Sequence, residues 1–161
     1  MKTAVVFYTR DGSTRIAAQV LAEDLDADVF ELEEASKRGR STFCFVWAGF
    51  SASFGIKSRL KDDFSAQMKA YERICIGTPV WAGRAVPALN AFLQHFDPRG
   101  KEMIIFTVQA DPSPTQKCAQ KMAKILTKKG AHVQKTMSLY GAGVGKIAQR
   151  GDIERQISAQ L

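Results

Sequence analysis

Short apolar runs alternate along the chain with segments in which apolar side chains recur every three or four residues. The runs are rich in β-branched and aromatic residues and end at turn-forming residues, a pattern that predicts strands. The first run is almost wholly apolar, which is typical of a strand buried on both faces of a parallel sheet. The runs cover residues 4–8, 28–32, 73–76, 103–108 and 132–139.

The segments between these runs fit amphipathic helices that pack one face against a sheet. A helix after the fourth strand has the clearest ends, because Ser113 is a capping residue, Pro114 suits the first helical position and Gly130 suits the stop. Apolar side chains also lie at helical spacing in residues 14–25, 87–96 and 152–161.

The alternation of strands and helices predicts an α/β protein. We expect a doubly wound, five-stranded parallel sheet with helices on both faces, built by right-handed crossovers. A chain of 161 residues is long enough for one packed core and short for two, so residues 1–161 are expected to form a single domain. In such a sheet, ligands bind beyond the carboxyl ends of the strands, where the strand order reverses. The loops after the first, third and fourth strands are therefore the candidate binding loops.

The composition bears on several classes of function. The chain has 23 Lys and Arg against 16 Asp and Glu, a net charge of +7, so some surface should attract anions, and a peripheral contact of this surface with a membrane stays open. The basic residues are scattered and match no nucleic-acid-binding motif, so nucleic acid is not an expected partner. No apolar run approaches the roughly 20 residues of a membrane span and the first residues do not resemble a signal peptide, so we expect a cytoplasmic protein with no membrane span.

The three cysteines predict neither a disulfide framework nor a metal site. Cys44, Cys75 and Cys118 are odd in number, widely spaced and free of any CxxC pair. We interpret each of them as a small buried apolar residue.

The loop after the first strand, "YTRDGST" at residues 8–14, places hydroxyls and a glycine where a helix begins. A helix N-terminus carries unpaired N–H groups and the positive end of the helix dipole, so the pattern predicts an anion site. Thr9, Ser13 and Thr14 have hydroxyls to donate, and Gly12 lets the backbone approach a phosphate closely. The loop matches neither the dinucleotide fingerprint nor the P-loop. The alternative is a turn that merely caps its helix.

A second glycine-rich stretch, "GAGVGK" at residues 141–146, follows the last predicted strand. It lacks the acidic residue that a dinucleotide site needs about 20 positions further on. We interpret this stretch as a flexible loop.

The loop after the third strand carries "GTPVWAG" at residues 77–83. Trp81 has too much apolar area to stand free in water at the ligand edge of a sheet. It therefore either covers the core or stacks on a flat ligand.

The two loops together resemble those of the flavodoxin family, and the resemblance covers nearly the whole chain. The family's phosphate loop has the pattern (S/T)-x-T-G-x-T, in which x is any residue. Residues 9–14 fit this pattern except that Asp11 replaces the central threonine. The family's flavin loop often carries "GTPVWAG" or a near variant, which stands intact here. Flavodoxin is itself a standard example of a parallel sheet in the order 2-1-3-4-5 with FMN at the point of reversal, and we expect the same order here.

The resemblance implies FMN as the cofactor and assigns roles by position. The loop from Thr9 to Thr14 would hold the phosphate, with Asp11 making a turn or cap contact to its own helix. Trp81 would stack on the isoalloxazine ring, the peptide between Ala82 and Gly83 would face flavin N5, and the loop after the fourth strand would line the pyrimidine edge. No catalytic residue is implied. The implied cofactor-binding residues are Thr9, Arg10, Asp11, Gly12, Ser13, Thr14, Thr78, Pro79, Val80, Trp81, Ala82, Gly83, Thr107, Gln109, Ala110 and Asp111.

The net charge departs from the family's usual pattern, because electron-carrying flavodoxins are usually acidic. Arg84 follows Gly83 directly and is expected to lie near the flavin. A cation at that place would stabilise the reduced, anionic flavin by Coulomb attraction, so the flavin should be easier to reduce than in acidic flavodoxins.

Two functions stay open. The first is an FMN-binding electron carrier that exchanges electrons with a redox partner protein or a small flat acceptor. The second is a flavin-dependent oxidoreductase that acts on a quinone or porphyrin-like substrate and is linked to NAD(P)H; His95 and His132 match no catalytic motif that would favour it. A phosphoacceptor receiver domain shares this sheet but needs an aspartate at the end of the third strand, where residues 77–79 supply none.

Two further points stay open. Residues 41–54 are aromatic and basic, and they fit either a helix that covers the sheet or a lid or docking patch. The oligomeric state, monomer or homodimer, is not decided by any pattern in the chain.

Overall fold

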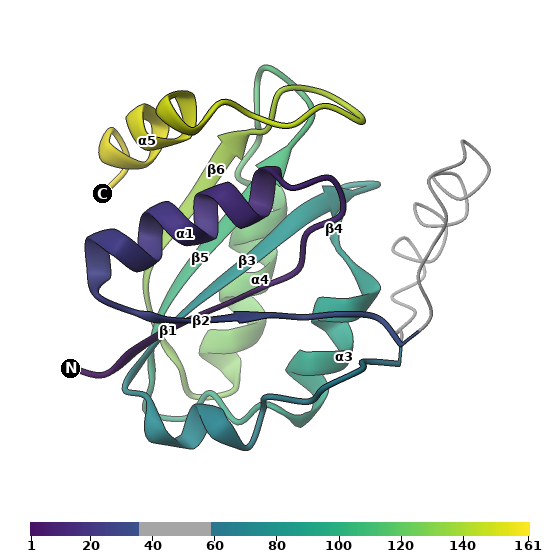
Figure 1. Ribbon diagram of the computed structural model, residues 1–161. Coiled ribbons are helices and arrows are strands. Elements are labelled where there is room, and N and C mark those ends of the chain that lie inside the picture. The colour runs from purple at the N-terminus through teal and green to yellow at the C-terminus, as the bar shows by residue number, and fades with distance from the viewer. Residues whose placement is uncertain (36–58) are drawn as a thin grey trace.

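The computed structural model describes residues 1–35 and 59–161, which form one parallel sheet between two layers of helices (Figure 1). The strands lie in the order β2-β1-β3-β5-β6, and the short strand β4 pairs with β3 outside this path. The strands are β1 Thr3–Phe7, β2 Asp28–Glu31, β3 Arg73–Trp81, β4 Arg84–Ala85, β5 Glu102–Gln109 and β6 His132–Tyr140. The helices are α1 Ser13–Leu25, α3 Pro87–His95, α4 Lys117–Lys128 and α5 Arg150–Ser158, with a 3-10 turn at Gln67–Ala70.

The predicted fold class is confirmed. Counted along the chain without β4, the five parallel strands follow the expected order 2-1-3-4-5. Every residue of β1 is buried, as its apolar sequence predicted. Successive residues of β1 point to opposite faces of the sheet, so Val5 packs with one layer of helices and Val6 with the other.

Each face of the sheet has its own core. Helices α1 and α5 cover one face, where Leu21 and Ile153 are fully buried. Helices α3 and α4 cover the other, where Phe92 and Leu126 are buried among the strand side chains. Figure 1 shows α1 and α5 together on one side of the sheet and α3 and α4 on the other.

Strand β3 is longer than the sequence predicted. The strand was expected to end at residues 77–79, but it runs on to Trp81 and turns back through Ala82 and Gly83 into β4. Ala82 and Gly83 have φ angles of 50° and 72°, and a two-residue hairpin turn of type I′ requires positive φ at both positions. The segment read as a flavin loop is therefore the end of a β-hairpin.

Helix α4 begins later than predicted. Ser113 and Pro114 do not start the helix, which begins at Lys117. The Ser113 N–H donates to Asp111 Oδ1 (2.8 Å), and the amide of Gln109 bonds both the N–H (3.1 Å) and the carbonyl (2.7 Å) of Thr115. These side-chain bonds hold the segment in a loop that the capping pattern did not reveal. The predicted stop is confirmed, since Gly130, with φ of 91°, lies just past the end of the helix.

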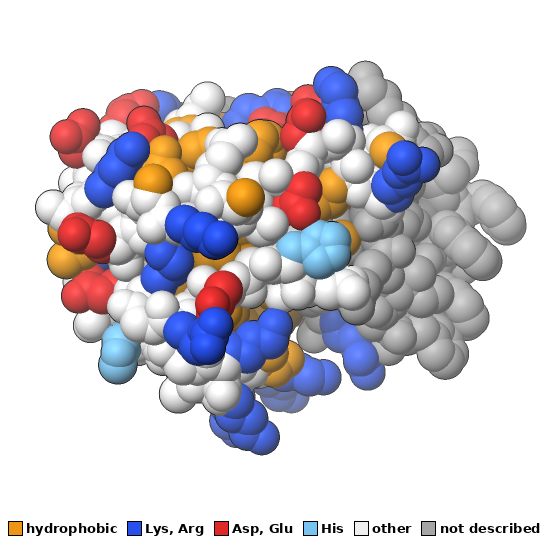
Figure 2. Space-filling model, turned by 90° about the horizontal axis from the view of Figure 1, so that it is seen from below, with side chains coloured by type: hydrophobic (Ala, Val, Ile, Leu, Met, Phe, Trp, Pro, Cys, Tyr) orange, Lys and Arg blue, Asp and Glu red, His pale blue; other side chains and the backbone are white. Residues whose placement is uncertain are grey.

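Much of the basic surface is mixed with acidic groups. Arg73 pairs with Glu102 (3.0 Å) and Arg150 with Glu23 (2.5 Å), and Figure 2 shows Lys and Arg side chains standing among Asp and Glu on one face. Helix α4 differs, because it carries Lys117, Lys121, Lys124 and Lys128 and no acidic residue.

The part of the chain that the structure describes contains no helix long and apolar enough to cross a membrane. Within residues 1–35 and 59–161, no three side chains of His, Cys, Asp and Glu come together as metal ligands. The aromatic and basic segment at residues 41–54 and Cys44 lie outside the described residues.

Cys75 and Cys118 are free and buried, and burial should make both unreactive. Burial raises the pKa of the Cys75 thiol to about 12 and that of Cys118 to about 11, because a charged thiolate is disfavoured in an apolar environment. We expect iodoacetamide near neutral pH to leave both thiols unmodified in the folded protein and to modify both after unfolding. Peptide mapping by mass spectrometry measures this, and fast labelling of Cys75 in the folded protein would contradict the burial.

Candidate functional site

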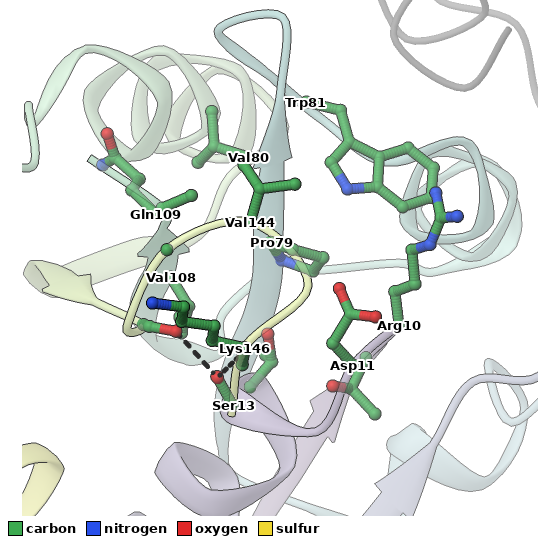
Figure 3. Close-up of a pocket in the computed structure, with 15 residues that line it drawn as sticks. Arg10, Asp11, Ser13, Pro79, Val80, Trp81, Val108, Gln109, Val144 and Lys146 are labelled. Atoms are coloured by element: carbon green, nitrogen blue, oxygen red, sulfur yellow. Dashed lines mark hydrogen bonds between the residues drawn. The ribbon is translucent and has the colours of Figure 1, made fainter. Parts of the chain in front are cut away.

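A pocket opens at the carboxyl edge of the sheet, where the strand order reverses between β1 and β3 (Figure 3). Its empty space is about 600 Å³, part of it open to solvent. The loops after β1, β5 and β6 and the end of β3 contribute its lining. The lining residues are Thr9, Arg10, Asp11, Ser13, Thr14, Pro79, Val80, Trp81, Val108, Gln109, Ala110, Gly141, Gly143, Val144 and Lys146.

The N-terminus of α1 points at this pocket without a side-chain cap. Gly12 is the N-cap residue, with φ of 116°. No side chain in residues 1–35 or 59–161 caps the helix, and its first turn holds no acidic residue. The positive end of the helix dipole and the first-turn N–H groups are therefore left for an anion.

Thr9 takes over the turn contact that was predicted for Asp11. Its Oγ1 accepts a hydrogen bond from the Gly12 N–H (3.0 Å), while no cap contact from Asp11 is formed. Arg15 is not the partner of Asp11. Its guanidinium forms a bidentate ion pair with Glu31 (2.6 and 2.7 Å), and this hydrogen bonding raises the Arg15 pKa. Figure 3 shows the Asp11 carboxylate directed into the space between Trp81 and the α1 N-terminus.

Ser13 is buried and joins α1 to the segment before α5. Its hydroxyl donates to the Gly141 carbonyl (3.0 Å) and lies 3.5 Å from that of Lys146, and it accepts from the Ala148 N–H (2.9 Å). A Cβ on Gly141 would lie 2.5 Å from a Val108 methyl and 3.2 Å from the Ser13 Cβ, so this segment packs closely only because residue 141 is glycine.

Residues 141–146 are therefore more than the flexible loop that we inferred from their glycines. The segment forms one wall of the pocket through Gly141, Gly143, Val144 and Lys146. Sequence analysis missed these residues because no motif marks them. Their position after the last strand, at the edge where ligands bind, was the available signal.

Trp81 stands at the opposite side of the pocket, held by the hairpin. Its ring is partly exposed and meets the Tyr8 ring edge-on, with centroids 5.9 Å apart. The Arg10 guanidinium lies 5.8 Å from the centre of the same ring. Figure 3 shows Trp81 and Arg10 together on one side and Gln109, Val108 and Lys146 on the other.

The structure brings most of the predicted site residues together around this pocket, but not all. Thr78 and Thr107 are buried side by side in the sheet, where Thr78 Oγ1 accepts from the Val86 N–H (3.3 Å) and Thr107 bonds the Ser138 hydroxyl (3.0 Å). The predicted residues that do not line the pocket are Gly12, Thr78, Ala82, Gly83, Thr107 and Asp111.

Arg84 also lies apart from the pocket. It lines a separate groove with α3 and α4, so the structure does not place it where the sequence suggested. Arg10 and Lys146 are cations that do line the pocket.

Comparison with curated proteins finds no match. Among solved structures, a candidate flavoprotein from Bacteroides uniformis is similar with a TM-score of 0.79 at 23% identity, covering 98% of this chain and 97% of that one. A flavoprotein in complex with FMN from Lactobacillus acidophilus is similar with a TM-score of 0.67 at 18% identity, over 85% and 92% of the two chains. Flavodoxin 2 from Bacillus cereus follows with a TM-score of 0.61 at 16% identity, over 96% and 94%. At these identities the likeness is one of fold.

The family assignment rests on the sequence. A family model described as flavodoxin matches residues 2–140, which is most of the chain. Together with the order of the sheet and the two loops at its point of reversal, this match shows that the chain belongs to the flavodoxin family.

Proposed function

We propose that the protein binds FMN in this pocket and works as an electron carrier. The observation that carries the proposal is the pairing of an uncapped helix N-terminus with a partly exposed tryptophan across one pocket. FMN has the same two ends, a phosphate dianion and a flat aromatic ring. When bound, FMN supplies one- and two-electron chemistry.

The phosphate end of the pocket is chemically suited to an anion. The first turn of α1 offers backbone N–H groups, and Thr9 and Thr14 add hydroxyls beside them. The hydroxyl hydrogen of Thr9 is not used in its bond to the Gly12 N–H, where the oxygen accepts. Lys146 adds a positive charge from the opposite wall, a role that no sequence motif predicted.

The other end of the pocket suits an aromatic ring. Trp81, Pro79, Val80 and Val108 give it apolar walls, and Trp81 is fixed by the hairpin and by the Tyr8 ring. Asp11 lies between the two ends, where its carboxylate can accept hydrogen bonds from the hydroxyl groups of a ribityl chain. We therefore assign the ribityl chain, and not the phosphate, as the neighbour of Asp11, since a carboxylate next to a phosphate would be repelled.

The lining favours a carrier over an oxidoreductase. Histidine is the side chain most often used for general acid–base catalysis, and the described residues that line the pocket include no histidine, cysteine or tyrosine. Asp11 and Lys146 can also transfer protons, but we assign them to the ribityl chain and the phosphate. A carrier needs a partner of its own, and we propose a redox protein or a small flat acceptor in that role. An NAD(P)H-linked enzyme acting on a quinone is the second candidate, favoured by the open side of the pocket.

Two measurements test this proposal. Purified protein should show a flavin visible spectrum, or acquire one when FMN is supplied, and the released chromophore should have the mass of FMN. The loaded protein alone should not turn over NADH with a quinone. Steady turnover would move the assignment to the enzyme, and a preparation that stays colourless with excess FMN would end the proposal.

The hydroxyl of Thr14 provides a test of the phosphate end. We expect Thr14→Val to weaken FMN binding about tenfold, because it removes one hydrogen bond to a charged group while keeping the shape of the side chain. Riboflavin, which lacks the phosphate, should bind both forms equally. Fluorescence titration with the two flavins measures the difference, with Thr127→Val on the exposed side of α4 as the matched control. Equal losses for FMN and riboflavin would show that the phosphate lies elsewhere.

A further inference from the structure

A second groove lies on the α3 and α4 face, beside the return strand of the hairpin. Its empty space is about 600 Å³, the same as that of the first pocket, and again part of it is open. None of its described lining residues lines the first pocket. Arg84, Asn90, Leu93, Lys121, Met122 and Ile125 are the lining residues that define its chemistry.

The groove has a polar end and an apolar end. Helices α3 and α4 each follow a strand at the carboxyl edge of the sheet and run back toward its amino edge. Asn90 and Lys121 lie near the start of these helices, and Leu93 and Ile125 lie one turn further on the same faces. Arg84 precedes α3 and joins the polar end. The charged groups therefore gather near the hairpin, and the apolar surface extends away from it.

Among the described residues, the cations of the polar end have no acidic counterpart. Neither Arg84 nor Lys121 forms an ion pair with any residue in 1–35 or 59–161, unlike Arg73 and Arg150. Helices α3 and α4 contain no Asp or Glu. Two exposed cations at one end of a groove make a local positive potential that attracts an anion.

The apolar end of the groove leaves apolar side chains in contact with water. Ile125 is 47% exposed on a helix whose other apolar residues, including Met122 at 5%, are mostly turned inward. Leu93 faces it from α3 and is only half-buried. A ligand that covered this end would remove apolar area from water.

We propose that this groove binds a small organic anion, with its carboxylate at Arg84 and Lys121 and its apolar body against Leu93, Met122 and Ile125. The proposal does not depend on FMN, because the two sites share no lining residue in the part of the chain that the structure describes. The Trp81–Arg84 pair of the hairpin connects them, so a ligand here would contact the strand that follows Trp81.

Octanoate is a suitable probe, well below the concentration at which it forms micelles. We expect saturable binding to the full-length protein, followed by calorimetry and by NMR shifts at the amides of Leu93 and Ile125. Octanamide lacks the negative charge of octanoate, and acetate lacks its hydrocarbon chain, so each should bind at least tenfold more weakly than octanoate. Absence of saturation by octanoate, or equal binding of octanamide, would overturn the proposal.

Variants separate the groove from the general charge of the protein. The double substitution Arg84→Gln with Lys121→Gln should weaken octanoate binding tenfold or more, and Ile125→Ser should weaken it severalfold, with the melting temperature unchanged. Lys124→Gln with Lys128→Gln is the matched control, since it removes two charges from the same helix outside the groove. An equal loss in this control would show an effect of net charge alone. Saturating FMN should leave octanoate binding unchanged, and competition by FMN would place octanoate in the first pocket and overturn the proposal.

Discussion

Replacing Gly77 by alanine is expected to lower the free energy of unfolding by about 3 kcal/mol. A Cβ at residue 77 would lie 2.1, 2.4 and 2.8 Å from three carbons of the Phe106 ring, far inside contact distance. Gly77 and Phe106 are paired on the adjacent central strands β3 and β5, and Phe106 is fully buried, so neither can move aside cheaply. Denaturant unfolding measures the loss.

Gly151→Ala is the matched control for this prediction. Gly151 lies in α5, and a Cβ there would meet nothing within 4 Å. Alanine is favoured over glycine in a helix by up to about 1 kcal/mol, so stability should stay the same or rise slightly. Combining Gly77→Ala with Phe106→Leu should cost less than the sum of the two single changes, because the smaller side chain makes room. Full additivity would contradict a direct clash between the two residues.

Gly77 also shows where sequence reasoning reached its limit. The "GTPVWAG" stretch was read as a flavin loop, and its first glycine is now explained by packing against a ring 29 positions further along the chain. The apolar runs were sufficient to predict the strands, because each run carries its own pattern, whereas the expected sheet order came from the resemblance to the flavodoxin family. A contact between paired strands leaves no such local pattern.

The start of α4 was missed for a related reason. Ser113 and Pro114 satisfy the local rules for a helix start, but the Gln109 side chain bonds both backbone groups of Thr115 and holds the chain in a loop. A glutamine at the end of a strand gives no sign of this bond. The local capping preference is therefore outweighed by a contact from the preceding strand.

The candidate site was predictable to the extent that its residues lie in motifs. The segments at residues 9–14 and 79–81 were identified as candidates, since each has a distinctive composition at the carboxyl edge of the sheet. Lys146 and Val144 were missed because no motif marks their segment, which the Ser13 hydroxyl holds against α1 through the Gly141 carbonyl and the Ala148 N–H. Arg84 was expected near the flavin because it is close to Trp81 in the sequence, but it lines the separate groove. Closeness in sequence does not tell toward which side of a hairpin a side chain points.

Ser13→Ala is expected to lower the free energy of unfolding by about 2 kcal/mol and to weaken FMN and riboflavin binding by the same factor. The hydroxyl is the acceptor for the buried Ala148 N–H and the donor to the Gly141 carbonyl, and its loss leaves both groups without that partner. The segment at residues 141–146 is then held less firmly, and it forms a wall of the pocket. Denaturant unfolding and titration with both flavins measure the two effects.

The ratio of the two flavin affinities decides between two roles for Ser13. The sequence predicted a direct contact with the phosphate, in which case Ser13→Ala would weaken FMN alone and leave stability almost unchanged. The structure instead shows the hydroxyl bonded within the protein, so stability and both affinities should fall together. Ser158→Ala at the exposed end of α5 is the control and should change neither. A selective loss of FMN would return Ser13 to the phosphate and would mean that the bonds to residues 141–148 open when FMN binds.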